Sequence, residues 1–224
     1  MQRDLLDALR CPHPHDEQWL VALVHAADGP RITAADLACP LCQAVFAVRH
    51  GIGAFRLAPS TVPAPGAAAV QAAPEAMRLA ALLGGGDPGG AHGAMPILLA
   101  GHEAAAGVAL AAIGARPQLW INPVTDAVRP TPEDLWAVLE VDDRLPLGRG
   151  TLAAASLDAA HAGHPPLVAS VALAIRPGGR LVAPAGTPVP PDVKILADDP
   201  RQWVGEVVAA PGGLVTLRRQ SPPA

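Results

Sequence analysis

The sequence predicts an α/β protein with a mostly parallel sheet, an antiparallel hairpin at its C-terminal end, and a small metal-binding unit in front. Two observations support this prediction. Beyond residue 75, short apolar runs alternate with Ala/Leu-rich stretches of helical length, which is the pattern of parallel strands joined by crossover helices. Before residue 57, three cysteines occur in two short motifs, and the rest of the chain contains none.

Composition excludes several classes of protein. A chain of 224 residues with 50% hydrophobic residues can bury one medium domain and a smaller one. Its net charge of -4 argues against sequence-independent binding of nucleic acid through charge alone. Three cysteines without a charged-then-apolar leader predict a cytoplasmic protein and not a secreted disulfide framework. The most apolar stretch, residues 95–114, contains His102 and Glu103, so no membrane segment is expected.

A Pro/Ala-rich stretch without charge, residues 58–74, predicts a linker between an N-terminal unit (1–57) and a C-terminal unit (75–220). Within the C-terminal unit we expect strands at 97–100, 118–121, 138–141, 152–156 and 180–183, and helices at 75–83, 103–113 and 166–175, with a short turn at 132–136. The tail contains two β-rich runs separated by Ala-Pro-Gly-Gly (210–213), which predicts the closing hairpin.

The cysteine motifs predict a metal site. Cys39-Pro-Leu-Cys42 is a knuckle whose two thiolates can converge on one tetrahedral ion. Upstream, Cys11 is followed by His13 and His15, so a Cys3His donor set is available. The alternative is that the cysteines are buried small hydrophobic residues in a ribbon without metal.

Three segments in order carry a resemblance: LLDALRCP, ACPLC and VRHGIGAFRL. Together they are similar to the Trm112-type zinc ribbon over residues 4–57, with its pattern LLxxLxCPxC, CxxC and IxDGIPxxL. The resemblance implies a structural zinc ion and a module that docks onto methyltransferases. The family's second cysteine falls at Pro14, which cannot bind metal, so we expect His15, or else His13, to join Cys11, Cys39 and Cys42.

Two later segments resemble class I S-adenosylmethionine-dependent methyltransferases. LEVDDRLPL (139–147) is similar to the family's acidic stretch, and ALAIRPGGRLV (172–182) to its fifth-strand signature. The resemblance covers residues 95–183 and implies a Rossmann-like sheet preceded by the zinc ribbon. It also implies contacts to the cofactor from Gly101, Asn122 and Asp143.

The cofactor motif itself departs from the family pattern. The acidic-x-Gly-x-Gly-x-Gly turn corresponds to LAGHEAA (99–105), in which Gly101 is the one remaining glycine. Glu103 and Ala105 place side chains where the family brings backbone against the ligand. Asn122 replaces the acid that holds the ribose hydroxyls. No catalytic residue is identified, so whether the chain is an enzyme stays open.

These departures favour a methyltransferase-like protein that does not use the cofactor and acts as a binding, scaffold or activator protein, with a protein partner such as a methyltransferase. The alternative is an active methyltransferase acting on RNA or a small molecule. A third hypothesis is a structural subunit of a larger assembly, suggested by Trp19, Trp136 and Trp203, which we expect to be exposed.

Overall fold

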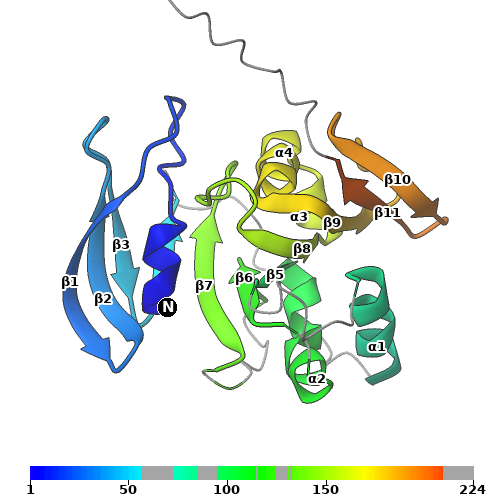
Figure 1. The fold of residues 1–224 in the computed structure, drawn as a ribbon, viewed down its shortest axis with the longest axis horizontal. Helices are drawn as coiled ribbons and strands as arrows, with labels where there is room; N and C mark the ends of the chain where they lie inside the picture. Colours follow the sequence, from blue (N-terminus) through cyan, green and yellow to red (C-terminus); the bar gives the residue numbers. More distant parts are fainter. Residues whose placement is uncertain (57–72, 85–94, 115, 125–130, 132, 209–224) are drawn as a thin grey trace, which may run out of the picture.

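The computed structural model describes residues 1–56, 73–84, 95–114, 116–124, 131 and 133–208, without the side chains of residues 73 and 74. Its described strands form one eleven-stranded sheet with the order β1-β2-β3-β4-β7-β6-β5-β8-β9-β11-β10 (Figure 1). Among these residues, no helix is both long and apolar enough to cross a bilayer.

The centre of the sheet is parallel and buried on both faces. It consists of β5 (Ile97–Ala100), β6 (Gln118–Ile121), β7 (Leu135–Val141), β8 (Leu152–Ser156) and the longer β9 (Ile175–Pro184). Every residue of β5, β6 and β8 is buried, as expected for continuous apolar strands with helices on both sides. These three strands match their predicted bounds. In contrast, β7 begins three residues earlier and β9 five residues earlier than predicted.

The seven strands from β7 to β10 have the order of a doubly wound sheet with one additional strand inserted. Counted from β5 as the first strand, the order across the sheet is 3-2-1-4-5-7-6. The last two strands, β10 (Val193–Asp198) and β11 (Gln202–Val207), form an antiparallel hairpin, and β11 is also antiparallel to β9. The sheet does end in an antiparallel hairpin, but β10 and β11 form it, and not the two predicted runs, the second of which lies outside the described part of the chain.

Two layers of helix cover the central strands. On one face α1 (Ala73–Leu82), the 3-10 helix η2 (Gly101–Ala106) and α2 (Gly107–Ala112) form an apolar cluster with side chains from β5 to β9. On the other face lie α3 (Ala159–Ala162) and α4 (Pro165–Ala174). The helix predicted at 103–113 is divided into η2 and α2, and α1 begins at the end of the predicted linker, most of which is outside the described residues.

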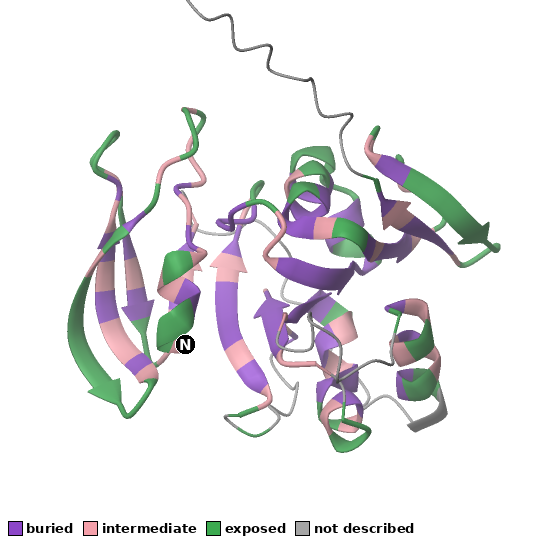
Figure 2. Cartoon of the chain, viewed as in Figure 1, coloured by how far each residue is buried: buried purple, intermediate pink, exposed green. Residues whose placement is uncertain are grey.

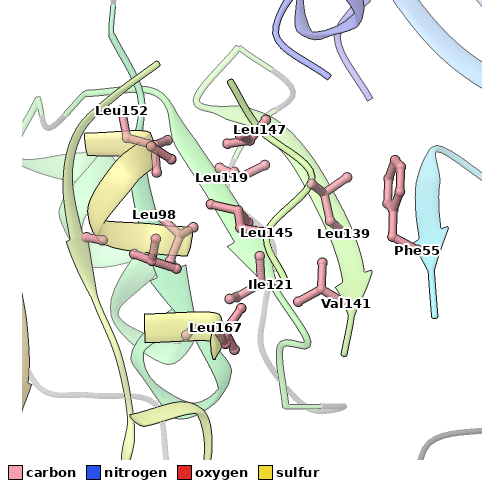
Figure 3. Packing of buried hydrophobic residues seen from close by; sticks show 14 of the residues in the cluster. Phe55, Leu98, Leu119, Ile121, Leu139, Val141, Leu145, Leu147, Leu152 and Leu167 are labelled. Carbon is pink, nitrogen blue, oxygen red and sulfur yellow. The ribbon is translucent and has the colours of Figure 1, made fainter. Parts of the chain in front are cut away.

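The N-terminal unit continues the same sheet. After the 3-10 helix η1 (Arg3–Asp7), strands β1 (Val21–Asp28), β2 (Arg31–Ala38), β3 (Val45–Arg49) and β4 (Ile52–Phe55) form an antiparallel meander. Strand β4 then pairs in parallel with β7, from Ile52 opposite Val138 to Phe55 opposite Val141. Figure 3 shows the Phe55 ring facing Leu139 and Val141 across this junction.

Helix η1 fills a gap in the helical layer. The connection from β7 to β8, residues 142–151, contains no helix, although a crossover between parallel strands usually supplies one. Leu5 and Leu9 of the N-terminal segment are fully buried in the cluster that contains Leu145 and Leu147 of this connection. Backbone hydrogen bonds join the two segments from Arg10 N to the Pro146 carbonyl and from Gly148 N to the Ala8 carbonyl.

Both edge strands of the sheet are exposed, as Figure 2 shows for β1 and β10. Of the three tryptophans expected at the surface, Trp19 is 57% exposed beside β1. The other two expectations were wrong: Trp203 of β11 is buried, and Trp136 is half-buried with its indole N–H donating to Asp4. Their large apolar area is used for packing, which is the more frequent role of tryptophan.

Candidate functional site

The two cysteine motifs meet at one end of the N-terminal meander. Cys11 follows η1, and Cys39 and Cys42 form the turn between β2 and β3. Donor atoms of Cys11, His15, Cys39 and Cys42 all lie within 4.8 Å of one another. The fold therefore brings together the four side chains predicted as metal ligands.

Two of the distances within the cluster suit a tetrahedral ion. Zinc–sulfur bonds of about 2.3 Å and zinc–nitrogen bonds of about 2.05 Å place ligand atoms about 3.8 Å apart for two sulfurs and about 3.6 Å apart for sulfur and nitrogen. The Sγ atoms of Cys11 and Cys42 are 3.7 Å apart, and Sγ of Cys39 is 3.5 Å from Nε2 of His15. The donor set is that of closed structural zinc sites, which leave no position for a reacting water.

The electrostatics of the cluster favour a bound cation. Burial opposes ionisation of Cys39, but the backbone N–H groups of Cys42 and Leu41 outweigh it and lower its pKa to about 7. Burial, with both other thiols nearby, raises the pKa of Cys11 to about 12. A thiol that resists ionisation among sulfur neighbours needs a positive charge to become a thiolate, and a metal ion supplies that charge.

His13, the alternative ligand, also touches the cluster. Its Nδ1 is 3.4 Å from Sγ of Cys42, and its ring lies edge-on to Phe46. Its Nε2 is buried and has no hydrogen-bond partner among the described residues. The geometry favours His15, which belongs to the group within 4.8 Å, and leaves His13 against the apolar side of the cluster.

A second set of polar groups lies at the carboxyl ends of β5, β6 and β8, where doubly wound sheets have their ligand crevice. Gly101 ends β5 with φ +55°, a conformation suited to glycine. A side chain there would overlap the carboxylate of Asp158 and would come within 2.8 Å of the His161 ring. The carboxylate of Asp158 accepts hydrogen bonds from the backbone N–H groups of His102 and His161, at 2.9 and 3.0 Å.

From Asp158 a chain of contacts crosses the crevice. Nδ1 of His161 is 2.6 Å from the Asp158 carboxylate, and Nε2 of the same ring is 3.2 Å from the amide nitrogen of Asn122. The side chain of Asn122 donates to the backbone carbonyl of Val141 and accepts from its N–H, at 2.8 and 2.9 Å. Arg56, which follows β4, donates to the same amide oxygen at 3.2 Å. The N-terminal unit thus contributes one end of the network.

The pKa values of two carboxyls in the crevice are shifted in opposite directions. Burial raises the pKa of Glu103, the Asp158 charge adds to the shift, and the Ser156 hydroxyl, which donates to Glu103 at 3.1 Å, partly opposes it. Burial also favours neutral Asp158, but its hydrogen bond to His161 and the charge of that ring prevail and lower the pKa. At neutral pH the crevice therefore contains a stabilised Asp158 carboxylate beside a carboxyl that ionises less readily.

Of the three residues expected to contact a cofactor, Gly101 and Asn122 lie at this crevice and are bridged by Asp158 and His161. Asp143 is exposed in the connection after β7. Sequence reasoning missed Asp158 and His161. The signal that could have identified them is local, since Asp158 directly precedes α3 and caps its first turn.

Fold and sites together define an α/β protein with a doubly wound sheet, a Cys3His cluster and a network of polar side chains at the carboxyl ends of its strands. No family model matches the sequence, and no curated protein matches it at a significant level. Similar solved structures do exist, and three of them are named as methyltransferases or as a complex of one.

The first of these is a complex between the Haloferax volcanii Trm112 methyltransferase activator and a methyltransferase candidate, with 20% identity, TM-score 0.32, and coverage of 40% of this chain and 44% of that chain. The antibiotic-resistance methyltransferase Kmr follows, with 15% identity, TM-score 0.37, and coverage of 60% and 93%. A geranyl diphosphate methyltransferase in complex with GPP and sinefungin has 17% identity, TM-score 0.33, and coverage of 49% and 43%. This chain thus spans less than half of the first and third structures. TM-scores this low do not establish a common fold by themselves.

Proposed function

We propose that this chain is a methyltransferase-like protein that no longer uses S-adenosylmethionine and acts in the cytoplasm by binding another protein, as a scaffold or activator. One observation carries the proposal: Asp158 and His161 occupy the space above Gly101. In doubly wound sheets, ligands bind outside the carboxyl ends of the strands, where the strand order reverses. Here that point lies between β5 and β8, the position of Gly101 and Asp158.

The polar groups at the positions of cofactor ligands already bond to, or repel, other groups. Asn122 uses its amide oxygen and nitrogen on the backbone of Val141, which leaves little capacity for ribose hydroxyls. Glu103 and Asp158 bring two carboxyls to the place where a carboxylate of the cofactor would lie, and like charges there disfavour binding. These observations support a binding role over the alternative of an active methyltransferase.

The same proposal includes a structural zinc ion held by Cys11, His15, Cys39 and Cys42. When bound, the ion would fix the segment before β1 to the turn between β2 and β3 and supply no catalytic water, because four protein ligands close its coordination sphere. Its role would be to stabilise the meander, whose last strand, β4, pairs with β7.

An exposed apolar surface on the meander supports a protein partner. Val21 and Val45 lie opposite Ala38 on one face of the sheet, and Leu23 is two residues along from Val21 on the same face. The side chains of all three are more than 60% exposed. With exposed Trp19 nearby, they form an outer patch of the kind that marks contact sites between proteins.

Calorimetric titration of the full chain with S-adenosylmethionine and S-adenosylhomocysteine tests the loss of cofactor binding. We expect no saturable heat up to about 1 mM ligand, a limit of about -4 kcal/mol in binding free energy. The double variant Asp158→Ala with Glu103→Gly empties the crevice and is the informative comparison. Saturable micromolar binding by the unmodified chain would overturn the proposal.

Affinity purification from the native cell tests the binding role. The unmodified chain, the patch variant Leu23→Asp and the control Val108→Asp, which changes an exposed valine of α2, are compared. We expect a partner that the unmodified chain and the Val108 variant retain and the Leu23 variant loses. Recovery of all three chains alone would contradict a scaffold or activator.

A further inference from the structure

We propose that a small cavity at the amino ends of the central strands binds a phosphate group. The cavity has a volume of about 150 Å³ and lies at the opposite end of the strands from the filled crevice. Its lining includes three arginines, Arg116, Arg176 and Arg180, and no acidic residue among the described part of the chain. Three guanidinium groups around one cavity stand out in a chain whose net charge is -4.

A bulge in β9 sets two of these arginines around the cavity. Between Leu152 opposite Ile175 and Ala154 opposite Arg180, β8 advances two residues while β9 advances five. The extra residues of β9 form a loop through Gly178, whose φ is +78°. Gly179 lies against the Ala153 carbonyl so closely that no side chain fits there. Arg176 and Arg180 therefore flank a backbone loop that is fixed in place.

Arg180 is anchored with part of its donor capacity. Its Nη1 donates to the carbonyls of Ala81 and Leu82 at the end of α1, at 3.0 and 3.3 Å. The side chain also passes over Gly84, where a Cβ would lie 3.5 Å from its Cδ and Nε. These contacts fix the position of the guanidinium at the cavity wall, which reduces the entropy lost when it binds a ligand.

Arg176 leaves a buried donor without a partner. Its Nη1 donates to the Pro177 carbonyl, but its Nε is buried and has no hydrogen-bond partner among the described residues. A buried, unpaired N–H is costly, so a shift of this side chain that brings its N–H to an oxygen in the cavity would be favourable. Because the group is cationic, an anionic oxygen would bind it more strongly than a neutral one.

The size of the cavity limits the ligand. Pockets for drug-sized ligands usually measure about 300–1,000 Å³, so a whole nucleotide does not fit here. Since one water takes about 30 Å³ in the liquid, a phosphate group with a few waters does fit. Arginine binds phosphate with paired N–H donors, and a phosphomonoester offers two negative charges to three cations. The proposal does not depend on whether the crevice binds S-adenosylmethionine.

Titration calorimetry of the full chain in phosphate-free buffer at low ionic strength tests the site. One arm uses inorganic phosphate, and the second uses a short single-stranded oligonucleotide with and without a 5′-phosphate. Arg176→Gln and Arg116→Gln each remove one guanidinium, and Arg144→Gln is the control, because Arg144 is an exposed arginine outside the cavity with the same change in charge. Thermal unfolding of each variant confirms that it is folded.

We expect saturable binding of phosphate that weakens at least about tenfold in the Arg176 or Arg116 variant and stays unchanged in the Arg144 variant. If the oligonucleotide binds only with its 5′-phosphate, and with an affinity similar to that of free phosphate, a terminal phosphate of nucleic acid enters the cavity. Binding of free phosphate alone would indicate a small phosphorylated ligand. Absence of saturable binding in both arms, or binding that neither cavity substitution weakens, would overturn the proposal.

Discussion

Replacing Asp158 with alanine tests the central residue of the hydrogen-bond network in the crevice. Asp158 is 7% exposed and accepts three hydrogen bonds, from the backbone N–H groups of His102 and His161 and from the His161 ring. A hydrogen bond to a charged group contributes about 1.5–3 kcal/mol, and loss of an N-cap costs about 1 kcal/mol. Because the contacts share one side chain, their contributions are not additive. We expect Asp158→Ala to lower the free energy of unfolding by about 3–5 kcal/mol.

Urea denaturation at pH 7 measures this change. Asp158→Asn keeps an oxygen that can cap α3 but loses the charge, so its loss should be intermediate. Asp143→Ala removes an exposed carboxyl and serves as the control, with an expected change within about 0.5 kcal/mol. If Asp158→Ala were as stable as the control, the side chain would not be the buried centre of the network, and the argument for a closed crevice would fail.

The dependence of this effect on pH has a definite sign. Because the pKa of Asp158 is lowered in the folded protein, its ionised form contributes stability above the ordinary value of 3.8, and that stability is lost as the pH falls through the folded pKa. The difference in unfolding free energy between the unmodified chain and Asp158→Ala should therefore shrink below about pH 4. A difference that stayed constant to about pH 2 would point to lost packing instead of lost charge.

Three further predictions concern other parts of the molecule. Because burial raises the pKa of Glu103, Glu103→Gln should increase stability at pH 7, measured by urea denaturation, and the gain should disappear below the ordinary value of 4.5. Mass spectrometry of metals should find about one zinc per chain, and Cys39→Ser should lose it and lower Tm by about 6–12 °C, for a loss of about 3 kcal/mol; full metal content in that variant would contradict the ligand set. In β4, a Cβ at Gly53 would lie 2.9 Å from Leu139, so Gly53→Leu should destabilise the β4–β7 junction by about 1–3 kcal/mol in denaturant unfolding, and an unchanged midpoint would refute this packing.

The parts of the fold that sequence predicts well are those determined by local patterns. Strands β5, β6 and β8 are short apolar runs between turn residues, and burial on both faces gives them their composition. The hairpin was assigned to the wrong partner because β10 is exposed on both faces, so its residues lack an alternation that would distinguish it from the tail.

The two candidate sites differ in the same way, because local sequence motifs specify one of them and not the other. Two knuckle cysteines three residues apart, with a third cysteine near two histidines, are enough to identify a metal cluster in the sequence, because each motif is local. The network in the crevice joins Arg56, Asn122, Asp158 and His161, which come from three separate segments. No spacing in the sequence specifies that these side chains meet, since the strand order alone brings them together.

Both units share one core, and for this reason the N-terminal unit affects the crevice. Strand β4 extends the sheet beside β7, and Leu5 of η1 and Leu9 just after it are buried on the face that the β7–β8 connection leaves without a helix. Arg56, one residue beyond β4, then reaches Asn122 at the end of β6. A zinc ion at the turn before β3 would lie at the same end of the sheet as Arg56, because β3 is antiparallel to β4, and the Phe46 ring beside the cluster stacks on Phe55. Because the pairing of β4 with β7 is continuous from Ile52 to Phe55, the position of Arg56 depends both on this pairing and on the ring contacts that link the cluster to Phe55.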